Sequence, residues 1–563
     1  MTGNASASTG NIAASLSFMA SRQPERAAIH CPAGRDAVGV AIYKTLTYAE
    51  LEREVGLLAS GLIAYGIGPG VRTALMVRPS IELFVLMFAL FRAGAVPVLI
   101  DPGIDRRALK QCLDEARPQA FIGVPMAHVG RVLLGWGRGS ITHRVTVGGS
   151  RLFWGGALYA QIRALGDKHG PVPPAAMAPD RLAAILFTSG ATGVPKGVEY
   201  QHRHFLAQII AIRAAFRIQP GEIDLPTFPP FALFDPALGM TSVIPDMDPT
   251  KPGSVDPVKL IHTIEKYGVT TLFGSPALVD VLANYGATTG KRLTTVKRVI
   301  SAGAPVTPKT VQRLRSMLPD DAEIFTPYGA TESLPVCAIE GREILALAER
   351  THRGEGICVG KPLPANQVRL VKVTDEAIEH FSSATDVLPG AIGEIVVCGP
   401  STTEAYFARA SATRLAKIEH DGRTWHRMGD VGYFDAQGRL WYGGRKAHRV
   451  ETGNGVFYPE IVEGVFNAHP KVRRTALVGV HVNGKAVPGI CVELTGELSK
   501  ADWKRVRFEL RDFALRNDVT NVIRHFWRHP GFPVDIRHNA KIDRIALARW
   551  ASKRADKADL GLT

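Results

Sequence analysis

Short β-branched runs alternate with helix-length amphipathic segments from the N-terminal part of the chain to about Gly329. Strands are predicted at residues 73–77, 96–100, 183–189, 270–275, 298–303 and 323–329, with helices at segments such as 49–65 and 257–267. Strands that alternate with helices favour mainly parallel α/β sheets. Ligands of such sheets bind at the carboxyl ends of the strands, where glycine, serine and proline cluster in this sequence.

The pattern changes after about Leu388. The runs EIVVCG, RTWHRMGDVGYFD and LWYGGRK have the length and turn residues of short antiparallel strands, and the last segment, from about Lys446 to Thr563, is shorter and mixed. With 563 residues and 46% hydrophobic content, the chain is long enough for three or four folding units of roughly 150 residues each. We therefore expect an α/β fold with stacked sheets, a β-rich subdomain and a small α+β C-terminal domain.

The net charge of 67 − 52 = +15 is compatible with nucleic acid, an anionic membrane surface or anionic small molecules as partners. Lysine and arginine are interleaved with acids almost everywhere, and even the densest basic cluster, residues 504–516, contains Glu509 and Asp512. Because a basic tail, zinc-finger spacing and an aromatic RNA-binding signature are all missing from the sequence, we expect no nucleic-acid partner.

Three sequence features bear on where the chain resides. The six cysteines form no CxxC pair, which argues against structural zinc or a disulfide framework and fits a reducing compartment. The N-terminal stretch MTGNASASTGNIAASLSF lacks the basic region and apolar core of a secretory signal. The most hydrophobic stretch, residues 83–100, is interrupted by Arg92, Gly94 and Pro97, so it predicts a buried helix followed by a buried strand. We expect a cytoplasmic protein without a transmembrane segment.

The stretch LFTSGATGVPKGVEY, residues 186–200, joins two strand-like runs through a loop of small and hydroxylated residues with one lysine. Glycines let the backbone N–H groups approach an anion, hydroxyls add donors, and Lys196 adds a positive charge, so the composition suits phosphate groups. A P-loop is excluded, because Lys196 follows Pro195 and a strand, not a helix, comes next. On these residues alone, an ordinary Gly/Pro hairpin stays open as the alternative.

Several motifs in order resemble the adenylate-forming superfamily of acyl-CoA synthetases, luciferases, fatty acyl-AMP ligases and peptide-synthetase adenylation domains. They are TSGATGVPKG (188–197), SAGAP (301–305), TPYGATES (326–333), MGDVGYFDAQGRLWYGGRK (428–446) and NAKIDR (539–544). The resemblance covers nearly the whole chain. It implies a large N-terminal ATP- and acyl-binding domain, residues 1–445, and a mobile C-terminal lid domain, residues 446–563, with ATP and Mg²⁺ as cofactors.

The resemblance also implies a role for each residue of the nucleotide site. Thr331 would contact the α-phosphate, Glu332 would hold Mg²⁺, and Tyr328 would lie against adenine. The β- and γ-phosphates would be held by Thr188, Ser189, Gly190, Thr192, Gly193 and Lys196. The other side of adenine would be shaped by Gly303, Ala304 and Pro305. Asp430 would accept hydrogen bonds from the ribose hydroxyls, and Arg445 would be a second ribose or phosphate contact. Read alone, Asp430 is also compatible with a turn residue and Arg445 with a surface charge.

Lys541, in the NAKIDR motif, would bridge the carboxylate and the α-phosphate as charge shifts in the transition state. Members of the superfamily rotate the C-terminal domain between half-reactions, and many have Asp or Lys at the pivot. This chain has Ala447 at that position, which leaves retention of the rotation open.

The segment FPPFALFDPALGM, residues 228–240, stands where relatives line the acyl pocket. Its apolar residues would form a wall suited to a fatty chain: Phe228, Phe231, Phe234 and Met240. Asp235 is unusual there and has two interpretations. Asp before Pro is commonly a turn or helix-cap residue, which favours a structural role; alternatively Asp235 is a catalytic base for a substrate hydroxyl. His202 is predicted to begin the helix after the phosphate loop and to be structural.

The acyl segment, with residues 99–105, 446–460 and 534–544, is most similar to olefin β-lactone synthetases. That resemblance implies adenylation of a 2-alkyl-3-hydroxy fatty acid and closure by its own 3-hydroxyl, with AMP released. It implies thiolase-like, reductase and decarboxylase enzymes as partners in one assembly. The alternatives are a long-chain acyl-CoA synthetase or fatty acyl-AMP ligase, which would pass the adenylate to a thiol, and a non-catalytic nucleotide-binding protein.

Overall fold

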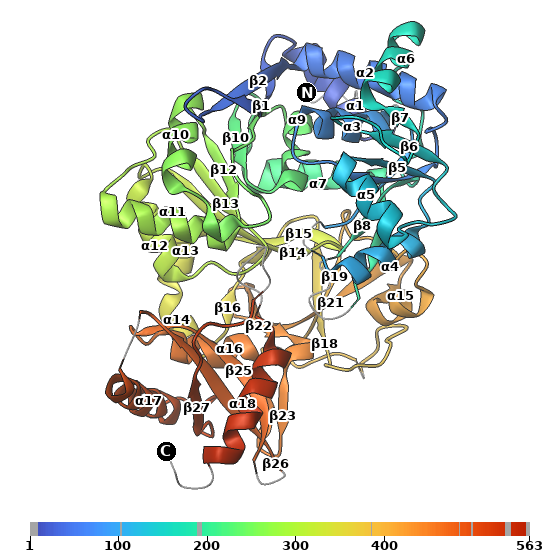
Figure 1. The fold of residues 1–563 in the computed structure, drawn as a ribbon. Helices are drawn as coiled ribbons and strands as arrows, with labels where there is room; N and C mark the ends of the chain where they lie inside the picture. Colours follow the sequence, from blue (N-terminus) through green and yellow to red (C-terminus); the bar gives the residue numbers. More distant parts are fainter. Residues whose placement is uncertain are drawn as a thin grey trace.

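The computed structural model describes residues 10–101, 104–188, 194–383, 385–482, 485–496, 499–534 and 542–558. Two large sheets lie side by side, with a β-rich sheet and a C-terminal three-stranded sheet below them (Figure 1). None of the helices in the described part of the chain combines the length and apolar character needed to cross a bilayer.

The first large sheet has the order β7-β6-β5-β3-β4-β8-β9 and is parallel except at its edge strand β9. Its strands are β3 (Arg72–Met76), β4 (Val96–Leu99), β5 (Ala120–Gly123), β6 (His143–Thr146), β7 (Ala157–Leu158), β8 (Leu182–Phe187) and β9 (Gly197–Gln201). Alternate residues face opposite sides, so Leu75 and Ile122 join one core while Ala74 and Phe121 join another. The accompanying helices are α1 (Ala14–Arg22), α2 (Tyr48–Ala64), α3 (Ile81–Arg92), α4 (Arg106–Ala116), α5 (Pro125–Leu134) and α6 (Tyr159–His169).

The second large sheet has the order β17-β15-β14-β13-β12-β10-β11-β1-β2 and is parallel from β1 to β14. Its strands are β1 (Ala27–Arg35), β2 (Ala41–Thr47), β10 (Ile223–Pro226), β11 (Thr241–Val243), β12 (Thr271–Gly274), β13 (Arg298–Ser301), β14 (Glu323–Ala330), β15 (Ser333–Glu340) and β17 (Lys361–Pro362). One face packs on α10 (Pro257–Tyr267), α11 (Pro276–Thr289) and α12 (Pro308–Met317). Its other face contributes Phe273, Ile300 and Phe325 to the largest core, which it shares with the first sheet and with α7 (His202–Ala215).

The β-rich sheet is antiparallel, with β16 (Ile357–Cys358), β18 (Gln367–Val371), β19 (Gly393–Cys398), β20 (Lys417–His420), β21 (Arg423–Phe434) and β22 (Leu440–Arg445). Of the three short helices nearby, α15 (Ala410–Ala416) packs on β20 and β21, whereas α13 (Gly341–Ala346) packs on β14 and β15 and α14 (Ala348–His352) on α16 (Pro459–Asn467). This arrangement matches the antiparallel strands predicted after Leu388.

The C-terminal residues form two small sheets, β23 (Val450–Thr452) with β24 (Gly455–Phe457), and β25 (Val472–Val482), β26 (Lys485–Leu494) and β27 (His525–Arg528). Helices α16 (Pro459–Asn467) and α17 (Lys500–Leu515) share one core with the three-stranded sheet, and α18 (Arg544–Ala558) shares another. Both cores are made only of residues after position 449 among those described.

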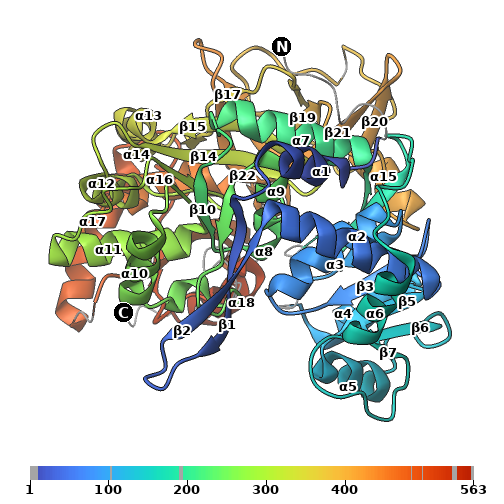
Figure 2. The same ribbon diagram turned by 90° about the horizontal axis from the view of Figure 1, so that it is seen from above.

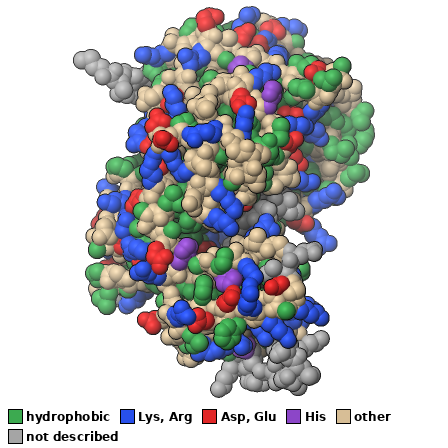
Figure 3. Space-filling model, turned by 90° about the vertical axis from the view of Figure 1, so that its left-hand side faces the viewer, with side chains coloured by type: hydrophobic (Ala, Val, Ile, Leu, Met, Phe, Trp, Pro, Cys, Tyr) green, Lys and Arg blue, Asp and Glu red, His purple; other side chains and the backbone are tan. Residues whose placement is uncertain are grey.

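The predicted fold class is confirmed, and the six predicted strands correspond to β3, β4, β8, β12, β13 and β14. The apolar stretch at 83–100 is α3 followed by β4, as expected. All six cysteines are free. On the face that Figure 3 shows, basic and acidic side chains are interspersed, which agrees with the charge pattern of most of the sequence.

Candidate active site

A cavity of about 3500 Å³ lies at the carboxyl ends of strands from both large sheets and extends to the β-rich sheet and the C-terminal residues. Residues that directly follow strands form part of its wall: Thr188 after β8, Thr227 after β10, Ser275 after β12 and Ala302 after β13. This position is where parallel α/β sheets bind ligands, because the loops there can vary without disturbing the strands.

The predicted phosphate loop connects β8 to β9 as a hairpin at this cavity. The Thr188 N–H donates to the Lys196 carbonyl at 3.0 Å, and the Lys196 N–H donates to Thr188 Oγ1 at 3.2 Å. Both residues line the cavity. Ser189, Gly190, Thr192 and Gly193, also assigned to this loop from the sequence, lie outside the described residues. Thr188 and Lys196 therefore face the cavity from the first sheet.

Glu332 follows β14 and is held by a segment that comes much later in the chain. The Tyr406 hydroxyl donates to Glu332 Oε1 at 2.6 Å, and the Thr403 N–H donates to the Glu332 carbonyl at 2.9 Å. The neighbouring Thr331 carbonyl accepts a hydrogen bond from the buried Tyr200 hydroxyl. Thr331 and Glu332 both line the cavity, and their backbone is anchored from two other elements.

Two ammonium groups approach the ring of Tyr406. Lys196 Nζ is 4.8 Å and Lys417 Nζ is 5.9 Å from its centroid. Lys417 is buried and also donates to the Thr403 carbonyl, and burial lowers the pKa of Lys417 to about 8. Cations over an aromatic face are stabilised by its quadrupole, so Tyr406 links the lysine of the phosphate hairpin to Glu332.

Asp430 on β21 and Arg445 at the end of β22 are directly opposite each other in the ladder, with Arg445 Nε 3.2 Å from Asp430 Oδ1. The Tyr328 hydroxyl donates to Asp430 Oδ2 at 2.7 Å. Burial raises the pKa of Asp430, while Arg445 opposes that shift, and Asp430 raises the pKa of Arg445. Three residues that the sequence assigned separately to adenine and ribose therefore form one connected group.

The turn after β13 completes that side of the cavity. Gly303, Ala304 and Pro305 all line it, and Gly303 has a φ of +99°, a conformation that glycine adopts without strain.

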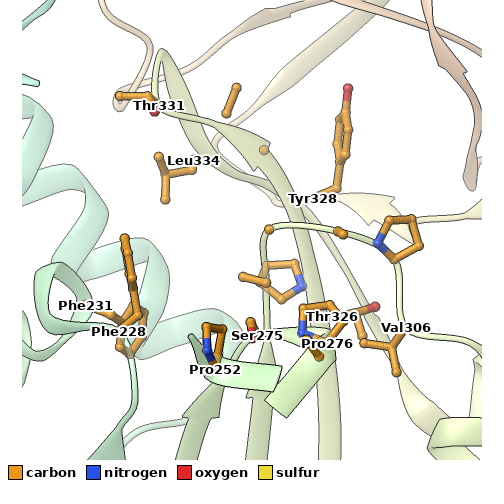
Figure 4. Close-up of a pocket in the computed structure, with 18 of the residues that line it drawn as sticks. Phe228, Phe231, Pro252, Ser275, Pro276, Val306, Thr326, Tyr328, Thr331 and Leu334 are labelled. Atoms are coloured by element: carbon orange, nitrogen blue, oxygen red, sulfur yellow. The ribbon is translucent and has the colours of Figure 1, made fainter. Parts of the chain in front are cut away.

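The predicted acyl wall lies across the cavity from the tyrosine. Figure 4 shows Phe228 and Phe231 on one side, with Leu334 above them, and Tyr328 on the other side. Phe231 stacks on Phe273 of β12 with ring centroids 3.6 Å apart, and Phe234 lines the same cavity. Met240 differs from the expectation: it is buried in the main core, where its carbonyl accepts from Tyr48, and it is not among the described lining residues.

Asp235 lies away from the position that its catalytic interpretation requires. It is the first residue of the short helix α9 (Asp235–Leu238), is fully buried and is not among the described residues that line the cavity. Its Oδ2 accepts from the Ser242 hydroxyl, and the carboxyl group of the buried Asp224 of β10 lies beside it. Burial raises the pKa of Asp235 to about 7 and raises that of Asp224 as well. The side chain thus points into the core, which fits the structural alternative and not a base beside the substrate.

Residues from the C-terminal part of the chain close the remaining wall. His448, Glu460, Glu463 and Arg544 line the cavity, and Arg544 pairs with Glu463. Burial raises the pKa of Glu460 to about 7 and lowers that of His448 to about 4. Lys541 lies outside the described residues, three positions before Arg544.

Comparison with known proteins bears directly on this arrangement. A family model described as AMP-binding enzyme matches residues 18–407, more than half of the chain. This chain belongs to the AMP-binding enzyme family.

Two curated relatives of this AMP-binding enzyme match over nearly their whole length. It is 56% identical to the olefin beta-lactone synthetase of Xanthomonas campestris pv. campestris over 550 residues, covering 97% of this chain and 98% of that protein. It is 54% identical to the olefin beta-lactone synthetase of Stenotrophomonas maltophilia, covering 97% and 99%. The solved amide bond synthetase McbA from Marinactinospora thermotolerans has a TM-score of 0.76 at 23% identity over 96% of this chain and 99% of that one, which supports the fold alone.

The residues of the AMP-binding enzyme fit a nucleotide with a divalent cation. Asp430 Oδ1 is buried and, apart from its ion pair with Arg445, accepts no hydrogen bond from the described residues, so it has capacity for a ribose hydroxyl. Of the two carboxylate oxygens of Glu332, only Oε1 accepts a hydrogen bond from the described residues, which leaves Oε2 for a hard cation such as Mg²⁺.

Sequence reasoning missed Thr403, Tyr406 and Lys417 of this AMP-binding enzyme. Thr403 and Tyr406 lie in STTEAYF, which has no residue type that signals catalysis, and Lys417 begins β20. The STTEAYF segment gains its importance from pairing with β9: the Glu199 N–H donates to the Ala405 carbonyl and the Phe407 N–H to the Gly197 carbonyl. His202 begins α7 as expected, and its ring accepts from the Ile12 N–H.

Proposed function

We propose that this AMP-binding enzyme activates a 2-alkyl-3-hydroxy fatty acid as its adenylate and then closes the acid to a β-lactone, with release of pyrophosphate and AMP. The observation that carries the proposal is 56% identity, over nearly both full lengths, to a protein named olefin beta-lactone synthetase. The aromatic wall that faces the nucleotide-side residues across one cavity supports it, because the substrate has both an alkyl chain and a reacting carboxylate.

In the first step a carboxylate oxygen attacks the α-phosphorus of ATP, and the bond to pyrophosphate breaks. Two anions must meet, so the site has to supply positive charge in a fixed geometry. Lys196 and the phosphate hairpin would hold the departing β- and γ-phosphates, Thr331 the α-phosphate, and Asp430 with Arg445 the ribose. Tyr328 would face adenine. Mg²⁺, held by Glu332, would neutralise phosphate charge. Lys541 would bridge the two reacting groups.

In the second step the substrate's 3-hydroxyl oxygen attacks its own activated carbonyl. A carbon–oxygen bond closes the four-membered ring, the acyl–phosphate bond breaks, AMP leaves with its electron pair, and the hydroxyl proton passes to solvent. Attack within one molecule has a high effective concentration and needs no thiol acceptor, while cleavage of the acyl phosphate offsets the ring strain. Because Asp235 faces the core, we do not assign it the hydroxyl proton.

We further propose a division of the chain into an N-terminal domain, residues 1–445, that binds ATP and acid, and a mobile C-terminal domain, residues 446–563, that carries Lys541. Two cores confined to residues after position 449 support this division. The pivot residue Ala447 follows Lys446, whose Nζ contacts Glu394 Oε2 at 3.2 Å.

The chemistry of substrate and product suggests the proposed partners. A thiolase-like enzyme would join two acyl chains, a reductase would produce the 3-hydroxyl, and a decarboxylase would remove CO₂ from the lactone to leave an alkene. We place this assembly in the cytoplasm, supported by the six free thiols.

The test is product analysis with ATP, Mg²⁺ and a synthetic 2-alkyl-3-hydroxy acid, with and without coenzyme A. We expect NMR signals of a β-lactone and equal amounts of AMP in both reactions. Formation of a thioester only when coenzyme A is present would replace this proposal with an acyl-CoA synthetase. Failure to form AMP in either reaction would reject adenylation itself.

A further inference from the structure

One part of the chain departs from the even mixture of charges found elsewhere. Residues 116–166 contain no aspartate or glutamate, but they contain six arginines: Arg117, Arg131, Arg138, Arg144, Arg151 and Arg163. This stretch includes α5 and the loop between β6 and β7, which project together at the lower edge of Figure 2. The acyl pocket and the nucleotide site do not account for this concentration of positive charge.

Large apolar side chains are exposed in the same stretch. They are Met126, Val132, Leu133 and Leu134 of α5, and Leu152 and Phe153 of the loop, with Leu133 75% and Phe153 71% exposed. We call these six residues, together with Arg131, Arg138, Arg144 and Arg151, the α5 face. Met126 and Leu133 are seven positions apart and therefore lie on one side of the helix.

The helix and the loop of the α5 face form one packed unit. The ring of His128 stacks on Trp154 at 5.3 Å, and Trp154 in turn contacts the Phe153 ring at 5.3 Å. The Trp154 indole donates to Thr146 Oγ1 at 3.0 Å, which ties the loop to β6. The exposed apolar groups are thus presented by a rigid support.

The arginines of the α5 face lack acidic partners. Among the described residues, no carboxylate forms an ion pair with Arg131, Arg138, Arg144 or Arg151. The Nε atoms of Arg131 and Arg144 are buried without a hydrogen-bond acceptor. Burial and Arg144 together lower the pKa of Arg131, as expected when two guanidinium groups lie near each other. Arg151 donates to the Gly156 carbonyl and Arg131 lies over the Phe121 ring, but neither contact neutralises the guanidinium charge. Guanidinium groups without an acidic partner bind phosphate oxygens well.

The cavity of the active site reaches this surface. Val124, Met126, Ala127 and Trp136 line it, and Met126 is also one of the exposed residues of the α5 face. Met126 of the α5 face therefore lines the same cavity as Phe231 and Phe234 of the acyl wall.

We infer that the α5 face docks on a lipid bilayer that carries anionic phospholipids, with its apolar side chains among the acyl chains and its arginines at the headgroups. Basic residues beside exposed apolar groups are attracted to such a surface both by charge and by burial of apolar area. Because Met126 belongs both to this face and to the cavity lining, a docked chain would take its long-chain acid from the bilayer. That last step rests on the proposed function, whereas docking does not.

Vesicle flotation with the full chain tests the docking without ATP or acid. We expect binding to vesicles of phosphatidylcholine and phosphatidylglycerol in a roughly 3:1 ratio, weak binding to phosphatidylcholine alone, and loss of binding at about 0.5 M salt. Arg138→Gln with Arg151→Gln should weaken binding about tenfold or more. Leu133→Ser with Phe153→Ser should weaken it at least about fivefold.

Matched control pairs are available elsewhere on the surface. Leu388 and Phe508 are 79% and 73% exposed, so Leu388→Ser with Phe508→Ser removes equally exposed apolar groups. Lys504→Gln with Arg511→Gln removes the same charge from α17. Both control pairs should bind vesicles within about twofold of the wild type. All four double variants should adenylate a short, water-soluble 3-hydroxy acid at the wild-type rate, which establishes folding.

Three results would overturn the inference. The first is that the wild type does not bind the anionic vesicles. The second is that the control pairs lose as much vesicle binding as the α5 variants. The third is that both α5 variants bind vesicles as well as the wild type. If light scattering shows that the α5 variants instead change the oligomeric state, the face is an interface between protein copies. If the chain binds vesicles but forms no lactone, the proposed function is rejected and the docking inference stands.

Discussion

The Tyr406 hydroxyl donates a hydrogen bond to Glu332 Oε1 at 2.6 Å, while its ring lies 4.8 Å from Lys196 Nζ. One side chain therefore connects the carboxylate assigned to Mg²⁺ with the lysine assigned to the phosphates. The segment that carries Tyr406 pairs with β9 through an isolated bridge between Val198 and Tyr406. Tyr406 acts in this arrangement as a positioning residue for Glu332.

Replacement of Tyr406 by phenylalanine removes that hydrogen bond and keeps the ring. A hydrogen bond to a charged group contributes about 1.5–3 kcal/mol, so we expect ATP–pyrophosphate exchange to fall about 10- to 100-fold. The Mg²⁺ concentration needed for half-maximal exchange should rise, because the free carboxylate is no longer held in place. Exchange measured across a Mg²⁺ titration checks both effects.

Tyr433→Phe is the matched control, since the Tyr433 hydroxyl donates to the Glu355 carbonyl away from the cavity. It should leave exchange and the Mg²⁺ requirement unchanged. If Tyr406→Phe matches this control, Tyr406 does not position Glu332.

Asp430→Asn should weaken ATP binding more than acid binding. The substitution removes one carboxylate acceptor beside Arg445 and Tyr328, and a charge-assisted hydrogen bond of about 1.5–3 kcal/mol corresponds to at least a tenfold higher KM for ATP. Steady-state kinetics with each substrate varied checks this. Asp386→Asn, at an exposed ion pair with Arg369, is the control. An unchanged KM for ATP would remove Asp430 from the ribose site.

Asp235→Asn should preserve lactone formation to within about threefold, because a buried residue outside the cavity wall contributes packing and not proton transfer. Lactone and AMP are measured together in this variant. Normal AMP formation with no lactone would restore the role of Asp235 as a base.

The same substitution should change how stability depends on pH. Burial raises the pKa of Asp235 to about 7 in the folded chain, above the value of about 3.9 in an unfolded one. The folded state then holds more protons between these values, so the free energy of unfolding falls as pH rises from about 4 to about 7. Thermal unfolding measured between pH 5 and 8 should show that the unfolding temperature falls more steeply with rising pH in the wild type than in Asp235→Asn. Parallel curves would contradict the raised pKa.

Phe231→Ala should impair use of long-chain acids specifically. The ring stacks on Phe273 and forms part of the cavity wall. Loss of an aromatic contact with a bound alkyl chain costs about 1.5–3 kcal/mol, which predicts about a tenfold or greater rise in KM for the long-chain acid. KM for ATP should stay constant. Phe508→Ala, at an exposed site, is the control. An equal KM for long and short acids in Phe231→Ala would place the alkyl chain elsewhere.

The sequence predicted the fold well, since strands and helices follow from local patterns, and the structure brings its candidate nucleotide residues to one cavity. The strands at β3, β4 and β12 to β14 follow from short β-branched runs, and Thr188, Lys196, Tyr328 and Asp430 lie in or beside strand ends and turns. In contrast, the position of Tyr406 depends on its pairing with Val198, a residue far away in the sequence, which no local pattern specifies.

Orientation was the other limit of prediction. Asp235 and Met240 occupy the predicted acyl segment, but short helix α9 and the turn at Gly239 direct them into the core. Residue type alone does not determine which side of a one-turn helix faces a cavity. The proximity of Asp235 to Asp224 became visible only when β10 and α9 were placed together.

The most direct test of the central claim follows the oxygen atoms of the acid. A 2-alkyl-3-hydroxy acid with both carboxylate oxygens labelled with ¹⁸O is converted with ATP, and the products are analysed by mass spectrometry. Adenylation of the carboxylate predicts one ¹⁸O in AMP and one in the lactone, at its carbonyl. A lactone that retains both labels, with unlabelled AMP, would mean that the hydroxyl is activated instead and would contradict the account.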